Sequence, residues 1–265
     1  MSSNSTISCD MDNQYQDSRL RKYRPEIDGL RAFAVLGVII NHFNNDSLPG
    51  GFLGVDIFFV ISGYVITSSL YYRSAPQNSF QFLASFFQRR IKRLVPALAF
   101  YVLVLSLLIC AFNPVPGVSL DVGEKALLGL SNVNLYRRSF DYFSSSSDLN
   151  PFVHTWSLGV EEQFYLLFPV VALFVGFCHK SKNSNLRMAV FFLSISILSI
   201  IGFCIFYPEY HSLVYFLMPF RMWEMGFGII AFLATIKLSR LPKNTEKYIP
   251  TIAFAVINIV FIFFW

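Results

Sequence analysis

Two side chains on the first apolar run could carry acid–base chemistry. Arg31 lies near the start of the run Leu30–Ile40, and His42 follows its end, eleven positions later. In an α-helix eleven residues make almost three turns, so both side chains lie on one face, roughly 16 Å apart along the axis. An arginine at the centre of a membrane helix costs ~2.5–3.5 kcal/mol, and groups retained at that cost usually face a polar cavity. Imidazole exchanges a proton near neutral pH, which makes His42 a candidate general base. Alternatively, Arg31 marks the cytosolic end of a span and His42 reaches the opposite interface.

A second cluster follows at the start of the next run. Asp56 is placed about one helical turn inside that run, at a depth close to that of His42. We therefore expect it as a candidate partner of the imidazole. Gly54, Ser62 and Gly63 are small enough to admit close helix packing or a ligand. The alternative is a packing face with a capping aspartate.

The basic segment Gln88–Pro96 predicts an anion site. Arg90 and Arg93 stand three positions apart, so in a helix they share one face. Two guanidinium groups placed in this way can grip a phosphate or a pyrophosphate. The alternative is an ordinary cluster of inner-loop charges that binds lipid head groups.

The segment His154–Tyr165 is the densest polar stretch and runs directly into a span. It brings His154, Trp156 and the adjacent acids Glu161 and Glu162 within twelve positions. Helix capping explains one acid near a helix N-terminus and leaves the rest of the set unexplained. A weaker patch, Arg221 and Glu224 at i, i+3, is either part of a site or a self-neutralised pair between helices.

The overall composition predicts an all-α, polytopic membrane bundle. The chain is 54% hydrophobic, with a mean hydropathy of +0.51 and 30 Phe among 265 residues. Crossing a bilayer takes about 20 apolar residues. The four cysteines show no metal-ligand spacing, and no metal or bound cofactor is expected. Apolar runs fall at Ile27–Phe43, Phe52–Tyr72, Leu94–Phe112, Ala126–Tyr136, Leu158–Cys178, Met188–Tyr207, Leu213–Ile236 and Tyr248–Trp265.

The distribution of Lys and Arg predicts the topology. The net charge of +5 comes from bases that cluster between runs, as expected beside an anionic lipid leaflet, so it does not require a nucleic-acid partner. The N-terminus is expected to be cytoplasmic, with residues 1–22 disordered. The basic loops all fall inside only if Ala126–Tyr136 is re-entrant or lies at the outer surface, which gives seven spans instead of eight. The Ser-rich loop Ser139–Pro151 is then outside.

Jointly, these motifs resemble the bacterial membrane acyltransferase-3 family, integral-membrane O-acetyltransferases that modify cell-envelope and exported polysaccharides. The resemblance implies a multi-pass protein of the bacterial inner (cell) membrane that uses cytosolic acyl-CoA, with acetyl-CoA expected, as donor. The acceptor would be a hydroxyl of a cell-surface or exported glycan such as lipopolysaccharide. The family's Arg–His pair falls on Arg31 and His42, and its paired arginines on Arg90 and Arg93. Its Ser-Gly-Phe segment falls on Ser62, Gly63 and Tyr64, with Tyr replacing Phe.

The end of the chain departs from the family pattern. The family's module continues for several spans and often carries an extracytoplasmic domain, whereas the last run here stops at Trp265. We therefore expect residues 23–265 to form an incomplete transmembrane acyltransferase domain, with a C-terminal portion or extracytoplasmic partner domain elsewhere.

The expected mechanism is O-acyl transfer with His42 as general base, and His154 is the alternative candidate for that role. Asp56, Glu161 or Glu162 would orient the imidazole, and Arg31 would stabilise donor or oxyanion charge. Two other readings stay open: a proton-coupled transporter or flippase, although no internal repeat is evident, and a non-catalytic truncated remnant. The expected substrate-binding residues are Arg31, Arg90, Arg93, Ser62, Tyr64, Trp156, Arg221 and Glu224.

Overall fold

The described part of the chain consists of helices and their connections. A computed structural model describes residues 24–44, 46–73, 78–138, 150–179, 181 and 183–238, and no strand occurs within them. The segment 1–22, positions 139–149 of the Ser-rich loop and the run Tyr248–Trp265 lie outside the described residues. In chain order the helices are α2 (Pro25–Phe43), η1 (Pro49–Leu53), α3 (Gly54–Tyr71), α4 (Ser79–Phe112), α5 (Gly117–Leu127), α6 (Ser131–Arg137), η2 (Val153–Thr155), α8 (Trp156–Phe174), α9 (Ser184–Phe206), α10 (His211–Phe216) and α11 (Met218–Leu238).

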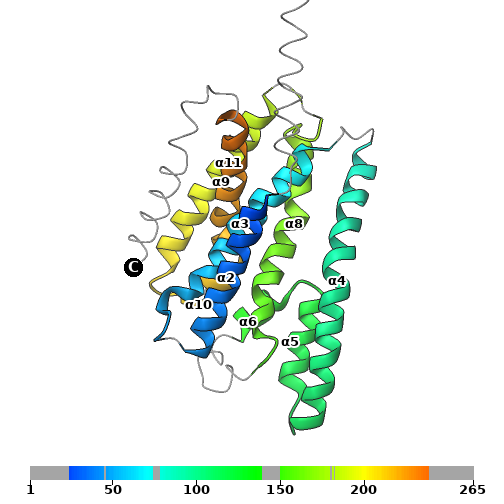
Figure 1. The fold of residues 1–265 in the computed structure, drawn as a ribbon, viewed down its shortest axis with the longest axis vertical. Helices are drawn as coiled ribbons and strands as arrows, with labels where there is room; N and C mark the ends of the chain where they lie inside the picture. The colour runs from blue at the N-terminus through cyan, green and yellow to red at the C-terminus, as the bar shows by residue number, and fades with distance from the viewer. Residues whose placement is uncertain are drawn as a thin grey trace, which may run out of the picture.

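Four stretches of helix are long and apolar enough to cross a membrane. They are Pro49–Tyr71, Ser79–Phe112, Val153–Phe174 and Ser184–Phe206. Helices α2 and α11 run alongside them in the same bundle (Figure 1). The prediction of an all-helical membrane protein is therefore confirmed, whereas seven to eight spans stay a prediction.

Helix α11 packs between α3 and α9, and small residues allow the close approach. A side-chain carbon at Gly63 of α3 would collide with the backbone of Met225, and one at Gly228 of α11 would collide with the carbonyl of Val60. Gly54 meets α2 in the same way, against Ala34. These glycines are packing residues, as in membrane helices generally.

Helix α4 is longer than a single span requires. Its 34 residues extend over roughly 51 Å, compared with a hydrocarbon core of about 30 Å. It begins at Asn78, whose side chain accepts a hydrogen bond from the amide of Phe80. The predicted run Leu94–Phe112 is the second half of this helix, and the basic segment Gln88–Pro96 lies around its middle. In Figure 1, α4 stands at the edge of the bundle with α5 along its lower part.

The run Ala126–Tyr136 is divided between two short helices. Helix α5 ends at Leu127 and α6 begins at Ser131, with Gly129 at φ +67° between them. Glycine adopts this left-handed conformation without the steric cost that a side chain brings. At 11 and 7 residues, neither helix is long enough to cross a bilayer. The prediction that this run does not span agrees with these lengths.

The run Leu213–Ile236 is also two helices. Helix α10 ends at Phe216, and Leu217 is extended at φ −90° and ψ 131°. Helix α11 then begins with Pro219 in its first turn, where the missing amide hydrogen costs nothing. The predicted run therefore begins with a separate short helix, because the proline favours a new helix start, and the 21 residues of α11 contain the rest of it.

Candidate active site

Two imidazoles meet at one end of the bundle. His42 comes from the last turn of α2 and His154 from η2, and their ring centroids lie 4.8 Å apart with the planes at 78°. The Nδ1 atom of His42 is 2.8 Å from the carbonyl oxygen of Val38, one turn earlier. A carbonyl only accepts hydrogen bonds, so this contact assigns the hydrogen to Nδ1. The Nε2 atom of the neutral ring then keeps its lone pair and can accept a proton.

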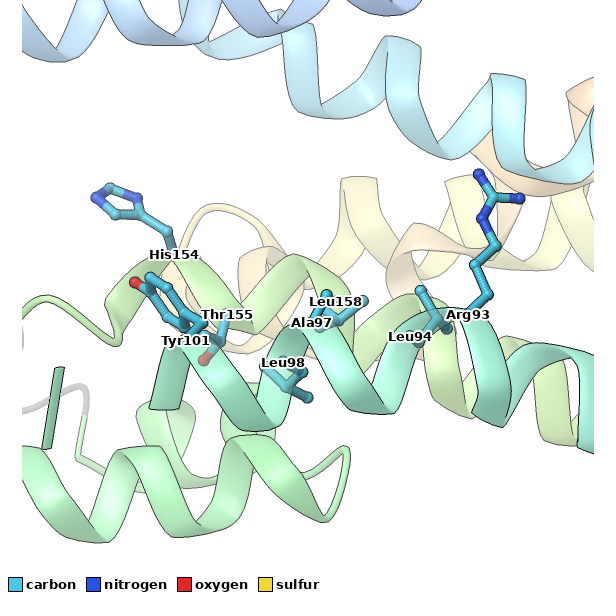
Figure 2. Close-up of a pocket in the computed structure, with 8 residues that line it drawn as sticks. All are labelled: Arg93, Leu94, Ala97, Leu98, Tyr101, His154, Thr155 and Leu158. Atoms are coloured by element: carbon cyan, nitrogen blue, oxygen red, sulfur yellow. The ribbon is translucent and has the colours of Figure 1, made fainter. Parts of the chain in front are cut away.

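A cavity of about 330 Å³ extends from this end along α4. Figure 2 shows Arg93 at one end of it and His154 at the other. The wall between them is apolar and is formed by Leu94, Ala97, Leu98 and Leu158. The cavity is therefore an open groove with a guanidinium group at one end and His154, the ring that contacts His42, at the other.

Tyr101 fixes the chain segment that carries His154. Its ring lines the cavity (Figure 2) and its hydroxyl donates a 2.7 Å hydrogen bond to the carbonyl of Pro151. Pro151 lies three positions before His154. Tyr101 thus ties α4 to the short segment that positions the second imidazole.

Arg221 is held between two carboxylates. Its guanidinium lies 2.6 Å from Asp56 of α3 and 3.0 Å from Glu224, one turn further along α11. The arginine is 7% exposed and the glutamate is fully buried. The guanidinium carbon also lies 5.6–5.7 Å from the ring centroids of Phe59, Trp156 and Tyr215, within the range of cation–π attraction.

A second carboxylate cluster joins three helices. Glu161 of α8 accepts hydrogen bonds from the hydroxyls of Ser62 and Tyr165. The guanidinium carbon of Arg90 in α4 lies 4.6 Å from the centre of the Tyr165 ring. The cluster therefore joins α3, α8 and α4 by polar contacts.

An amide pair holds the start of α6 against α8 and α10. The Asn132 side chain is fully buried and donates to the carbonyl of Phe216 at 3.0 Å. Gln163 donates to the side-chain oxygen of Asn132 at 2.8 Å and to the carbonyl of Gly129 at 3.0 Å. The sequence gives no functional signal at Asn132, whereas Gln163 lies inside the polar segment His154–Tyr165. Glu162 lies against Gly129 on the other side.

The structure corrects the expected partner of His42. Among the described residues no carboxylate contacts its ring: Asp56 binds Arg221, Glu161 binds Ser62 and Tyr165, and the orienting group is the Val38 carbonyl. A backbone acceptor four residues earlier in the same helix fixes a ring without any second helix, so an acid is not needed for that purpose.

The two arginines of the basic segment also separate. Arg93 is exposed and lines the cavity, whereas Arg90 stacks on Tyr165 and lies 5.8 Å from the Phe86 ring centroid. The two side chains therefore have different surroundings, and the expectation that both grip one anion stays a prediction.

Two further predicted residues lie toward the opposite end of the bundle. Arg31 pairs with Asp28 at 3.9 Å, as the i, i+3 spacing predicts. The Tyr64 hydroxyl accepts a 3.4 Å hydrogen bond from Arg24, and its ring packs 5.3 Å from that of Phe232. Neither contacts the histidine pair.

An exposed ion network stabilises the α5–α6 segment. Asp121 accepts from Asn134 at 2.6 Å and pairs with Arg138 at 3.0 Å. The hydrogen bond from Asn134, aided by Arg138 and Lys125, lowers the pKa of Asp121. The described residues contain no group of three or more His, Cys, Asp or Glu side chains suited to a metal ion.

The fold and these clusters define a helical membrane protein with a histidine-centred polar site. Residues 24–265 match the model of the acyltransferase-3 family, which is described as an acyltransferase domain, and the chain belongs to this family. The resemblance inferred from the motifs is thereby confirmed.

Similar curated proteins include several from Staphylococcus aureus. The O-acetyltransferase OatA of strain NCTC 8325 is 41% identical over 217 residues, which cover 80% of this chain and 35% of that protein. A protein of strain MSSA476 named as a candidate O-acetyltransferase is 38% identical over 235 residues, which cover 86% of this chain and 38% of that protein. The chain thus spans little more than a third of the length of these relatives. No solved structure matches the chain.

Proposed function

We propose that the protein is a membrane O-acyltransferase that moves an acyl group, with acetyl expected, from cytosolic acyl-CoA to a hydroxyl of a cell-surface or exported glycan. One observation carries the proposal: His42 has its Nε2 atom available beside His154, at one end of a cavity whose other end carries Arg93. The relatives named O-acetyltransferases support the acetyl group and an oxygen acceptor.

The cavity suits the donor. Arg93 at its entrance would hold the phosphates of acyl-CoA by charge-assisted hydrogen bonds. The apolar wall formed by Leu94, Ala97 and Leu98 would cover the thioester arm and exclude water. Arg31 lies eleven residues before His42 on α2, roughly 16 Å away along the axis. This distance favours a role for Arg31 on the donor side instead of at the oxyanion.

The chemistry requires one proton acceptor near the hydroxyl. His42 Nε2 takes the proton of the acceptor hydroxyl as its oxygen attacks the thioester carbonyl carbon. A carbon–oxygen bond forms and the carbon–sulfur bond breaks, and the imidazolium returns the proton to the departing thiolate. The products are an ester and free coenzyme A. His154, in ring contact with His42, would stabilise the proton transfer.

The Arg221 cluster would shape the acceptor side. One Asp56 oxygen binds Arg221, and the carboxylate, whose side chain is 24% exposed, has a second oxygen that can accept from a sugar hydroxyl. Trp156 sits between this ion cluster and the segment that carries His154. Ser62 and Glu161 would set the spacing of α3 and α8 behind it.

The orientation follows from the charges at the two ends of the bundle. Helix α2 begins beside Arg24, α3 ends beside Arg73, and α11 carries Lys237 in its last turn, and Figure 1 places these three ends together. At the opposite end, Lys125 and Arg138 are paired with Asp121. Positive residues favour the cytoplasmic side. We therefore place the N-terminus in the cytoplasm and the histidine pair at the outer face of the bacterial inner membrane.

The proposal can be tested in proteoliposomes. Radiolabelled acetyl-CoA would be supplied on one side and a panel of cell-envelope glycans on the other, with release of coenzyme A and label in the glycan as readouts. We expect both readouts to rise together. Solute flux without any coenzyme A release would instead support the transporter reading, and inactivity in both assays would contradict the proposal.

A further inference from the structure

An aromatic ladder extends outward from the Arg221 cluster along the end of α9 and α10. Its members are Trp156, Tyr215, His211 and Tyr207. The ring centroids of Trp156 and Tyr215 lie 4.6 Å apart with the planes at 40°. Those of His211 and Tyr207 also lie 4.6 Å apart, at 69°. His211 and Tyr215 stand four positions apart in α10, so their side chains share one helix face.

The ladder changes from buried to exposed along its length. Trp156 is 4% exposed, Tyr215 is 40% exposed and Tyr207 is 50% exposed. The inner end contacts Arg221, whose partner Asp56 carries the partly exposed carboxylate. The outer end lies at the last turn of α9. The rings therefore form a graded path from solvent to the polar site.

We infer that this ladder is the binding track for the acceptor glycan, an inference that rests on the proposed function. Sugar rings present flat faces of C–H groups that pack on aromatic faces, and their hydroxyls need polar partners at the ring edges. Tyrosine and histidine supply both an apolar body and a polar edge. Asp56 and the imidazole pair at the inner end would then receive the hydroxyl to be acylated.

A bilayer belt is the competing explanation, because tyrosines gather at membrane interfaces. The ladder differs from a belt in its inner half. Trp156 is buried and touches Arg221, so it faces the protein's own polar site and not lipid head groups. A belt also gives no reason for the two ring pairs to share one face of α10 between the exposed Tyr207 and the buried Trp156.

Tyr210 offers a matched control. It is 52% exposed, lies three positions from Tyr207, and belongs to another set of ring contacts through Phe206 at 6.2 Å. Its residue type, exposure and place in the turn after α9 all resemble those of Tyr207. A general anchoring role would therefore affect Tyr207→Ala and Tyr210→Ala alike, whereas a glycan track would affect only the first.

The test is calorimetric binding of neutral pyranose tetrasaccharides, chitotetraose among them, to the protein in lipid nanodiscs without any acyl donor. We expect Tyr207→Ala and His211→Ala to weaken binding about tenfold through the loss of a stacking surface. Tyr207→Phe, which keeps the ring, and Tyr210→Ala should bind as the unaltered protein does. Equal losses for Tyr207→Ala and Tyr210→Ala, or no binding of any tetrasaccharide by the unaltered protein, would overturn the inference.

A kinetic measurement tells failure of this inference apart from failure of the proposed function. In the transfer assay, Tyr207→Ala should raise KM for the glycan about tenfold and leave kcat unchanged. If the unaltered protein binds glycan in the predicted pattern and transfers nothing, the proposed function fails while the track stands. If transfer proceeds with normal KM in Tyr207→Ala, the track fails while the function stands.

Discussion

The histidine pair and the Glu161 cluster are built differently. At the His42–His154 end, a backbone carbonyl engages one ring nitrogen of His42, and the two rings meet edge to face beside a cavity. In the Glu161 cluster, the carboxylate accepts hydrogen bonds from the hydroxyls of Ser62 and Tyr165. The nearby guanidinium of Arg90 stacks on the Tyr165 ring. One cluster keeps a proton-accepting atom available, and the other uses its polar groups to join helices.

This difference separates residues that transfer protons from residues that hold the helices together. Polar groups inside a membrane protein are costly and are usually assigned to function. Here the carboxylates of Asp56, Glu161 and Glu224 are all engaged by partners on the protein itself. We therefore assign proton transfer to the imidazoles and the organisation of the bundle mainly to the acids.

The largest effect is expected at His42. His42→Ala should lower acyl transfer by ~10²–10⁴-fold, because it removes the general base. Coenzyme A binding and membrane insertion should be retained. Transfer would be measured as labelled ester in proteoliposomes. Near-normal transfer by the variant would move the catalytic role to His154.

A break in the Arg221 cluster should destabilise the protein. Arg221→Met leaves the partly exposed Asp56 and the fully buried Glu224 without a counter-charge, which costs ~3–5 kcal/mol. We expect a clear drop in the thermal midpoint in detergent. The double variant Arg221→Met with Glu224→Gln should recover part of that loss. Equal stability of the single variant and the unaltered protein would show that the cluster does not hold α3 to α11.

The separation of the two arginines predicts different phenotypes. Arg93→Gln should weaken acyl-CoA binding more than tenfold, since a charge-assisted hydrogen bond is worth ~1.5–3 kcal/mol. Arg90→Gln should have a much smaller effect on binding, because Arg90 stacks on Tyr165. Measuring acyl-CoA binding to each variant in nanodiscs distinguishes the two roles. Equal losses of affinity in both variants would instead show that Arg90 and Arg93 hold the phosphates together.

The smallest effect concerns the exposed network of α5 and α6. The pKa of Asp121 is lowered in the folded protein, so its stabilising contribution is present above the ordinary carboxyl value near 3.8 and is lost as pH falls through the lowered pKa. Asp121 is largely solvated, and the contribution should stay below about 1 kcal/mol. Amide exchange in α5 and α6 should therefore rise modestly in acid, and Asp121→Asn should remove this pH dependence.

Helical periodicity predicted the ion pairs within one helix but not the side-chain contacts between helices. The i, i+3 pairs Asp28–Arg31 and Arg221–Glu224 follow directly from spacing, and both occur. Asp56 joins Arg221 across 165 positions, which depends on how α3 and α11 pack. Spacing within one helix carries no information about that packing.

The same limit explains the contacts that were missed. The polar segment His154–Tyr165 was selected for its density of functional groups, yet the contact between His154 and His42 depends on how α2 and η2 are placed relative to each other. The Asn132 side chain satisfies the carbonyl of Phe216, at the break between α10 and α11. Pro219 signalled that break, whereas the length of the apolar run concealed it.

The availability of the His42 Nε2 atom is the claim on which the account depends most. Nitrogen NMR of the protein in nanodiscs, with ¹⁵N-labelled histidine and the His42→Gln variant to assign the signals, measures it directly. We expect a protonated Nδ1 and an unprotonated Nε2 for His42 in the neutral ring. A neutral ring protonated at Nε2 would contradict it, since the nitrogen assigned as the base would then carry a hydrogen already.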